Sequence, residues 1–268
     1  MSLSALSRAA SYAGNTLRYR HFWTHLAFSD LRARFRRSRL GILWLALQPL
    51  LLTIIMSGVF IFVFSQRFSD YSVYLFSGLI VWEFVTGCFV IGGMSYIAAE
   101  GYVRQVRLPM IIYPLKSALY CCIVFMLAFS GFTLYALAVK PQIVSLHWLY
   151  ILPFFLTLAV FGTPLAILSA IVNIRFRDFQ QGITLFLQML LYVSPVMMLP
   201  SVFEHRGLRE WNSINPVSAL LELFRAPLLE GTAPALSSYL LVLAWALLFW
   251  LLALALLARN ERKIVFYY

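Results

Sequence analysis

The chain of 268 residues contains six long apolar runs separated by short polar segments. A helix needs about 20 consecutive apolar residues to cross a bilayer, and most of the runs exceed that length. The fifth run is shorter and ends at Pro195 and Pro200, where we expect the helix to tilt or break. The sequence therefore predicts an all-α membrane protein with six transmembrane helices, at residues 40–64, 71–98, 110–139, 148–174, 182–199 and 236–258.

The distribution of Lys and Arg predicts the orientation. Six spans place both termini on one side of the membrane, and the segments on that side carry sixteen of the 21 basic residues. Because basic loops stay in the cytoplasm, we expect residues 1–39 and the tail 259–268 to be cytoplasmic. This topology accounts for the net charge of +11, so we predict no nucleic-acid partner. The five remaining basic residues are Arg67, Lys140, Arg206, Arg209 and Arg225.

The short loops predict one membrane domain over residues 1–268, with the spans in residues 40–258. Every polar loop is shorter than about 40 residues, which leaves no room for a separate soluble domain. Residues 1–35 are polar and basic, without the apolar core of a cleavable signal peptide. Cys88, Cys121 and Cys122 all fall inside spans, where we expect small apolar side chains rather than disulfides or metal ligands. We predict no metal site and no catalytic residue.

Residues 17–35 are predicted to form an amphipathic helix in the headgroup layer. Basic residues cover much of its other face, near anionic lipid phosphates. One interpretation is a simple anchor that sets the topology. The other is a gate helix beside the site where a lipid headgroup enters, with Arg36, Arg37 and Arg39 at the depth of a lipid pyrophosphate. The apolar residues recur at helical spacing, at Phe22, Trp23, Leu26, Ala27, Leu31 and Phe35.

The connection 99–109 is predicted to link two spans on the cytoplasmic side. It is short, and Pro109 ends any helix before the third span begins. Such a segment is either an ordinary tight loop or a short helix that moves both neighbouring spans with it. Residues 175–179 form a second compact turn, in which we expect Asp178 to pair with neighbouring arginines or to cap the next helix.

Seven short motifs follow one another across the spans. In the order of these motifs the chain resembles the permease subunit of ABC polysaccharide and polyol-phosphate exporters, which serve O-antigen, capsule and teichoic acid export. The resemblance covers residues 15–258. The motifs are RLGILW at 39–44, LQPL at 47–50, GLIVWEF at 78–84, RLP at 107–109, RDF at 177–179, SPV at 194–196 and NP at 215–216.

The resemblance implies a homodimer resting on two copies of a separate ABC ATPase, with an N-terminal interface helix in each permease. It also implies short external re-entrant helices before the last span, for which Ser218–Leu229 is suited. The chain has no phosphate-binding Gly-x-x-x-x-Gly-Lys-Ser/Thr loop, so ATP and Mg belong to the partner and this chain has no cofactor. The coupling helix that docks on the ATPase falls at Gly101, Tyr102, Val103, Arg104, Gln105, Val106 and Arg107.

The function implied is that of a permease subunit exporting a lipid-linked polysaccharide, of O-antigen or capsular type, across the bacterial inner membrane. The same architecture exporting a small lipid or drug is the alternative. A membrane-embedded enzyme is disfavoured, because all four histidines lie outside the spans or at their edges and no paired-aspartate motif appears. An ion-driven transporter is disfavoured too, because only one acidic residue falls within a span and no internal repeat is visible.

That acidic residue is Glu83, near the centre of the second span. A carboxyl group in hydrocarbon is costly, so it should face a cavity, the dimer interface or a hydroxyl such as that of Thr86. The family usually has a neutral residue there. Aromatic residues make up 16% of the chain and either line a glycan channel or face lipid and the membrane interface. The channel candidates are Trp44, Tyr74, Trp82 and Tyr96, together with Glu83.

Overall fold

A computed structural model describes residues 14, 16–105, 108–199, 209–264 and 267. These residues form helices and turns, without a strand, which confirms the all-α prediction for this part of the chain. Val106 and Arg107 of the predicted coupling segment lie outside it. Within the described residues, five helices are long and apolar enough to cross a membrane, at Gly41–Val63, Phe68–Gly93, Ile112–Val139, Leu146–Arg175 and Leu236–Glu261.

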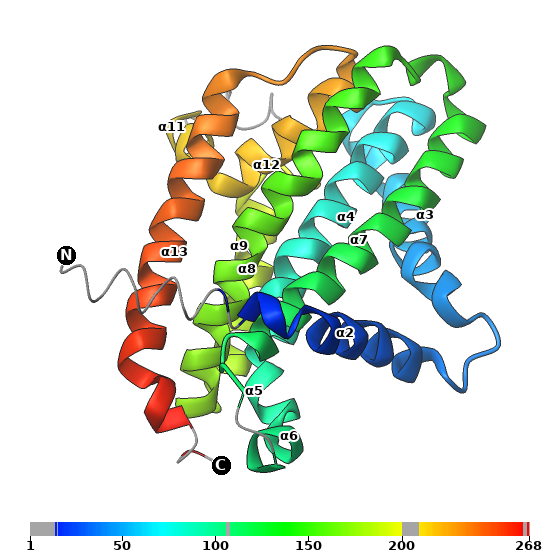
Figure 1. Ribbon diagram of the computed structural model, residues 1–268. Helices are drawn as coiled ribbons and strands as arrows, with labels where there is room; N and C mark the ends of the chain where they lie inside the picture. Colours follow the sequence, from blue (N-terminus) through cyan, green and yellow to red (C-terminus); the bar gives the residue numbers. More distant parts are fainter. Residues whose placement is uncertain (1–13, 15, 106–107, 200–208, 265–266, 268) are drawn as a thin grey trace.

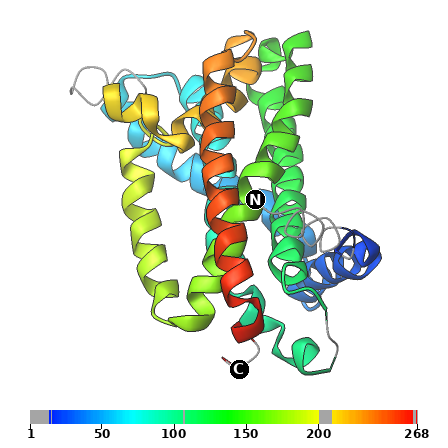
Figure 2. The same cartoon turned by 60° about the vertical axis from the view of Figure 1, so that its left-hand side comes forward.

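The fifth predicted run, 182–199, forms the shorter apolar helix α9 (Phe179–Val193). Its 15 residues extend for about 22 Å, whereas the hydrocarbon core of a bilayer is about 30 Å thick. Ser194 is extended and ends the helix, and Pro195 cannot continue it. α9 stands at the edge of the bundle beside α4 and α8 (Figure 2).

The five long helices run side by side, with α4 and α8 at the centre (Figure 1). In the most apolar stretches of α4 and α8, 67% of the residues are buried, whereas the share is 17% in α3 and 22% in α7 and α13. α3 and α8 are preceded by the short 3₁₀ helices η1 (Gly41–Leu43) and η3 (Leu146–Tyr150). The long helices are α3 (Trp44–Phe64), α4 (Phe68–Gly93), α7 (Ile112–Val139), α8 (Ile151–Arg175) and α13 (Leu236–Ile264).

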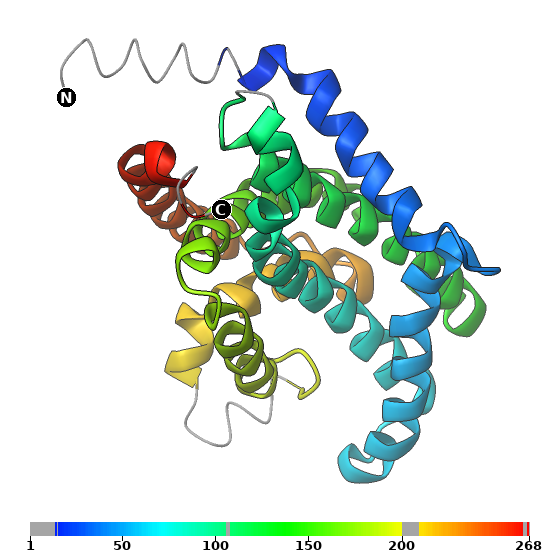
Figure 3. The same ribbon diagram turned by 90° about the horizontal axis from the view of Figure 1, so that it is seen from below.

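Helix α2 (Arg20–Phe35) lies across the ends of the long helices and packs on α7 (Figure 3). Lys116 of α7, itself buried, pairs its Nζ with Oδ2 of Asp30 at 2.5 Å. Nη1 of Arg34 donates to the Tyr120 hydroxyl at 2.8 Å. The helix is therefore fixed to α7 by polar contacts beside its buried apolar residues, which are Leu26, Ala27 and Leu31.

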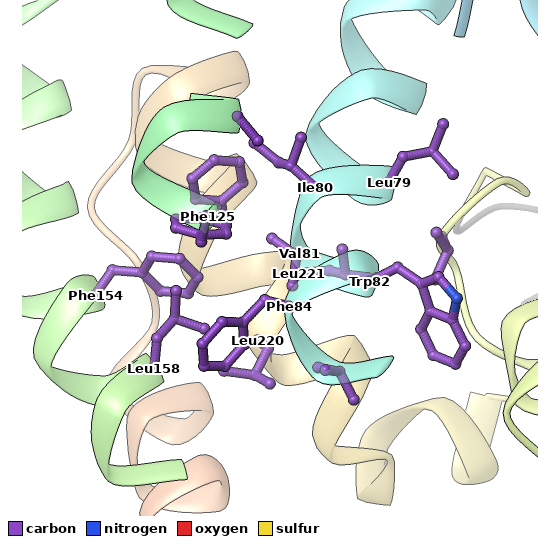
Figure 4. Packing of buried hydrophobic residues seen from close by; sticks show 14 of the residues in the cluster. Leu79, Ile80, Val81, Trp82, Phe84, Phe125, Phe154, Leu158, Leu220 and Leu221 are labelled. Atoms are coloured by element: carbon purple, nitrogen blue, oxygen red, sulfur yellow. The ribbon is translucent and has the colours of Figure 1, made fainter. Parts of the chain in front are cut away.

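Aromatic side chains fill much of the centre of the bundle. The Phe224 ring lies 5.1 Å from that of Phe154 and 5.7 Å from that of Phe125, measured between centroids. Figure 4 shows Phe84, Phe125 and Phe154 gathered on one side of α4, with Leu220 and Leu221 of α12 beside them. A large part of the aromatic content thus stabilises the packing of α4, α7, α8 and α12.

The short helices gather at the two ends of the bundle (Figure 1). At one end, which we call the α6 end, lie α2, α5 (Ser95–Ala98) and α6 (Glu100–Gln105). The second predicted span thus ends at Gly93, five residues earlier than expected, because α5 is a separate helix. At the opposite end, the α12 end, lie η2 (Pro141–Ile143), α11 (Arg209–Ile214), α12 (Pro216–Arg225) and the π-helical turn η4 (Ala226–Glu230).

Candidate functional site

The NP motif begins α12 and ties it to the turn after α9. Asn215 is the N-cap, and its side-chain oxygen accepts a hydrogen bond from the Val217 amide at 2.9 Å. Pro216 fits the first helical position, where its missing N–H is not needed. The Asn215 amide donates to the Ser194 hydroxyl at 2.8 Å. Two motifs separated by about twenty residues are therefore in direct contact.

Arg225, the last residue of α12, is buried and donates from all three guanidinium nitrogens. Nε donates to the Ser77 hydroxyl at 3.1 Å, and Nη1 donates to the Pro195 carbonyl at 2.6 Å. Nη2 donates to the carbonyls of Val196 at 2.9 Å and Tyr74 at 3.2 Å. The guanidinium carbon also lies 3.7 Å from the centre of the Tyr74 ring. We call this set of contacts the arginine junction.

The junction explains the first residue of the GLIVWEF motif. A Cβ atom at Gly78 would overlap Nη2 of Arg225 and would lie 2.5 Å from the Val196 carbonyl oxygen. Only glycine lets α4 approach the guanidinium and the turn this closely. The GLIVWEF and SPV motifs, separated by more than a hundred residues, therefore meet at Arg225.

The junction also supplies hydrogen-bond donors to backbone carbonyls in the turn after α9. Because α9 stops at Val193, the carbonyls of Pro195 and Val196 need donors from elsewhere, and buried carbonyls without donors are costly. Burial lowers the pKa of the Arg225 guanidinium, and the neighbouring Tyr74 opposes that shift. Arginine retains its proton in proteins, so Arg225 supplies a charged donor set that holds α12, α4 and the turn together.

A cavity of about 990 Å³ lies beside the junction, and we call it the α12 cavity. Its lining comes from α4, α11, α12, η4 and the start of α13. Asp70 pairs with Nζ of Lys140 through Oδ1 at 2.6 Å, and Glu222 accepts from the Ser238 hydroxyl through Oε2 at 2.7 Å. The other polar lining residues include Tyr74, Asn212, Ser213, Ser218, Glu230 and Ser237.

The predicted channel residues are spread along the bundle. Tyr74 lines the α12 cavity, and its hydroxyl donates to the carbonyls of Pro195 and Met198. Trp44 is 42% exposed at the start of α3, whereas Tyr96 is fully buried in α5 and packs edge-on against Tyr113. Tyr74 and Tyr96 are thus close to opposite ends of the molecule.

Trp82 and Glu83 lie midway along α4. The Trp82 side chain is buried but points away from the aromatic cluster (Figure 4). Glu83 is half-buried. The Thr86 hydroxyl donates to the backbone carbonyls of Trp82 and Glu83, at 3.0 and 3.1 Å, so it is not bonded to the Glu83 carboxyl group. A threonine hydroxyl in a helix readily bonds the preceding turn of backbone, which removes it as a side-chain partner.

The described part of the predicted coupling segment, Gly101 to Gln105, lies in α6. Arg104 pairs with Glu100 at 2.7 Å, and both side chains are largely exposed. Tyr102 is 45% exposed and packs edge-on against Phe22 of α2, with ring centroids 6.3 Å apart. α6 thus contacts the helix that lies across the bundle.

The remaining predicted residues lie between helices at the same end. The exposed arginines Arg36, Arg37 and Arg39 follow α2 directly and precede η1. Asp178 occupies the N-cap position of α9, but its side chain makes no capping hydrogen bond. The expectation that it caps this helix was therefore wrong. Asp178 itself has helical φ and ψ, unlike the extended conformation that lets a capping side chain reach the free amides.

Arg225 was not predicted as a site residue from the sequence, where it stood among the five remaining basic residues and within the predicted re-entrant segment Ser218–Leu229. The position of Arg225 within the mostly apolar segment 218–229 could have indicated its role. A single arginine surrounded by apolar residues in a short helix must be buried with partners or must reach an interface.

Comparison with known proteins identifies a membrane subunit of an ABC transporter. Residues 22–229 match the family described as ABC-2 type transporter, and the chain belongs to that family. It is 24% identical over 209 residues to a Klebsiella pneumoniae protein named O-antigen export system permease protein RfbA, with 76% of this chain and 78% of the relative covered. A Myxococcus xanthus protein of the same name is 26% identical over 236 residues, covering 85% and 90%.

Membership of this family defines the kind of protein. The chain is a multi-pass membrane protein and the transport subunit of an ABC system, so the general expectation is an ABC ATPase partner.

Proposed function

We propose that this chain is the permease of an ATP-driven exporter that moves a lipid-linked polysaccharide, of O-antigen or capsular type, across the bacterial inner membrane. The observation that carries the proposal is the family match over residues 22–229 together with relatives named as O-antigen export permeases. We further propose a homodimer with two ATPase subunits, since one chain presents one α6 to one partner.

The α6 end is proposed to face the cytoplasm. Basic residues are concentrated in the segments at this end, including Arg104 in α6 and Arg175 at the end of α8. Positive residues favour the cytoplasmic side, which supports both termini lying there. The α12 end then faces outward, and its short helices are the proposed re-entrant elements. We propose that α9 makes the sixth crossing, with the turn at Pro195 covering the part of the membrane that the helix is too short to span.

Movement of the ATPase is proposed to enter through α6. Tyr102 of α6 touches Phe22 of α2, and Asp30 of α2 is paired with the buried Lys116 of α7. A displacement of α6 would therefore be passed to the interface helix and to α7 through packed side chains. Val106 and Arg107 complete the proposed coupling segment.

The glycan path is proposed to lie where the outer helices leave α4 partly uncovered. Glu83, midway along α4, is half-buried, which suits a side chain facing a path or a second chain. The Trp82 side chain beside it is buried in this chain and points away from the aromatic core. Trp44 and Tyr74 would mark its two ends. Arg36, Arg37 and Arg39 would bind the lipid pyrophosphate beside membrane lipids, because arginine binds phosphate with paired hydrogen bonds.

The test is deletion of the gene in its host, with complementation by the intact chain. We expect the surface polysaccharide to disappear and the lipid-linked glycan to accumulate inside the inner membrane. Restored export on complementation would support the assignment. An unchanged surface glycan, with a small lipid or drug retained in the deletion strain, would replace it with the alternative substrate class.

A further inference from the structure

We propose that the α12 cavity is a saccharide-binding site, which holds neutral sugar units of the glycan as they emerge at the α12 end. This inference rests on the proposed export of a polysaccharide, and it adds a binding site at the Tyr74 end of the path along α4. The cavity volume of about 990 Å³ is at the upper end of the range for small-molecule sites.

The lining offers both kinds of hydrogen-bonding group that sugar hydroxyls need. A hydroxyl both donates and accepts, so a polyol site combines carboxylates with amides and hydroxyls. The bond between Asp70 and Lys140 uses Oδ1, and the bond from Ser238 to Glu222 uses Oε2. A carboxylate accepts about four bonds in total, so both groups retain capacity for a ligand. Glu222 is also exposed, and Asn212 supplies amide donors.

The charges disfavour an anionic ligand such as phosphate. Among the described lining residues, three are acidic, at Asp70, Glu222 and Glu230, and one is a guanidinium, at Arg225. Lys140, paired with Asp70, offsets one of the negative charges, so the balance stays negative. All three nitrogens of that guanidinium already donate to protein oxygens. A phosphate would therefore meet net negative charge without a free arginine, whereas a neutral sugar would not.

The cavity is bounded by the arginine junction, which gives it a fixed wall. Arg225 joins α4, α12 and the turn after α9, and Gly78 keeps them in close contact. A site on rigid elements loses little entropy when a ligand binds. In the proposed orientation it lies at the outward-facing end of the bundle, so weak binding of emerging sugars would oppose backward movement of the polymer between ATP cycles.

The experiment is site-specific photocrosslinking of the full chain in its native host. A benzophenone amino acid replaces Ser237, which lines the cavity on α13, or Leu247 of the same helix, which is 61% exposed and is not among the described lining residues. After irradiation, the purified chain is probed with an antibody against the host's surface glycan. We expect glycan on the chain labelled at residue 237, at least tenfold more than at residue 247.

Two acidic variants separate a specific site from general proximity. Glu222→Gln keeps an oxygen that accepts from Ser238 but removes the charge, and it should reduce crosslinking at residue 237 by about tenfold. Glu210→Gln alters an exposed carboxyl group of α11 that is not among the described lining residues, and it should leave crosslinking unchanged. The same strains are assayed for surface glycan.

The outcomes distinguish this site from the function on which it rests. Equal glycan labelling at residues 237 and 247, or none at either in cells that export glycan, would overturn the site and leave the export function standing. Equal effects of Glu222→Gln and Glu210→Gln would also overturn it. If deletion of the gene leaves the surface glycan intact, the export function itself has failed.

Discussion

The closest approach in the arginine junction is that of Gly78, and Gly78→Ala tests the junction with one methyl group. The new Cβ would overlap Nη2 of Arg225 and would lie 2.5 Å from the Val196 carbonyl oxygen. Because the second of these is a backbone atom, a side-chain rotation cannot remove the clash. α4 must therefore move away from the turn, and Arg225 then loses hydrogen bonds that join the two.

The expected cost follows from three contributions. Overpacking of a tight interior costs about 1–3 kcal/mol, and losing a hydrogen bond from the buried guanidinium adds about 1.5–3 kcal/mol. Replacing a helical glycine by alanine returns about 0.5–1 kcal/mol. The free energy of unfolding should therefore fall by about 1.5–5.5 kcal/mol. For a chain of this size that lowers the melting temperature by at least about 3 °C.

The assay is thermal unfolding of the purified variant in nanodiscs, followed by intrinsic fluorescence. Gly182→Ala is the matched control, because Gly182 also lies within a helix but has nothing within 4 Å of the added Cβ. It should melt at the wild-type temperature or a few degrees higher. If Gly78→Ala melts as high as Gly182→Ala, α4 does not approach the junction as described.

Three further predictions concern charged side chains. Arg225→Lys keeps the charge but not the forked donors, so at least one buried carbonyl loses its hydrogen-bond donor. The free energy of unfolding should fall by about 1–3 kcal/mol in the same assay. A melting temperature equal to that of the wild type would contradict this. Asp30→Ala should destabilise the chain, because the buried ammonium group of Lys116 loses its partner. Adding Lys116→Met should restore part of the lost stability. If the effects of the two substitutions are simply additive, Asp30 and Lys116 are not coupled. Arg104→Glu, combined with Arg107→Glu, should abolish ATPase docking and export. The free energy of unfolding should change by less than about 1 kcal/mol, because the ion pair between Arg104 and Glu100 is exposed. Unchanged docking and transport would rule out α6 as the coupling element.

The sequence predicted the long helices well, because hydropathy over about 20 residues reflects one dominant cost, that of placing polar groups in hydrocarbon. The bounds of α7 and α3 fall within a few residues of the apolar runs. The second run was misjudged at its end because α5 is also apolar, and composition does not register the break at Met94. α9 is shorter than its run because Ser194 turns out of the helix before Pro195.

The candidate site was less predictable, because its contacts join residues far apart in the chain. Gly78, Ser194 and Asn215 each belonged to a recognised motif, but their order gave no reason for them to meet. Arg225 lies outside those motifs, and only its burial with four oxygen partners reveals its role. Aromatic richness was ambiguous for the same reason, since a ring such as Phe224 has the same sequence signature in a core as in a channel.

If this chain is the permease of an ATP-driven exporter, it should be bound to an ATPase in the cell, and its partners therefore provide the decisive test. The tagged chain should be purified from its native host in a gentle detergent, and the stoichiometric partners should be identified by mass spectrometry. We predict an ABC ATPase subunit at a one-to-one ratio with the chain. A homomer that carries no ATPase, even after crosslinking in the cell, would rule out an ATP-driven exporter, because the energy source for export would be missing.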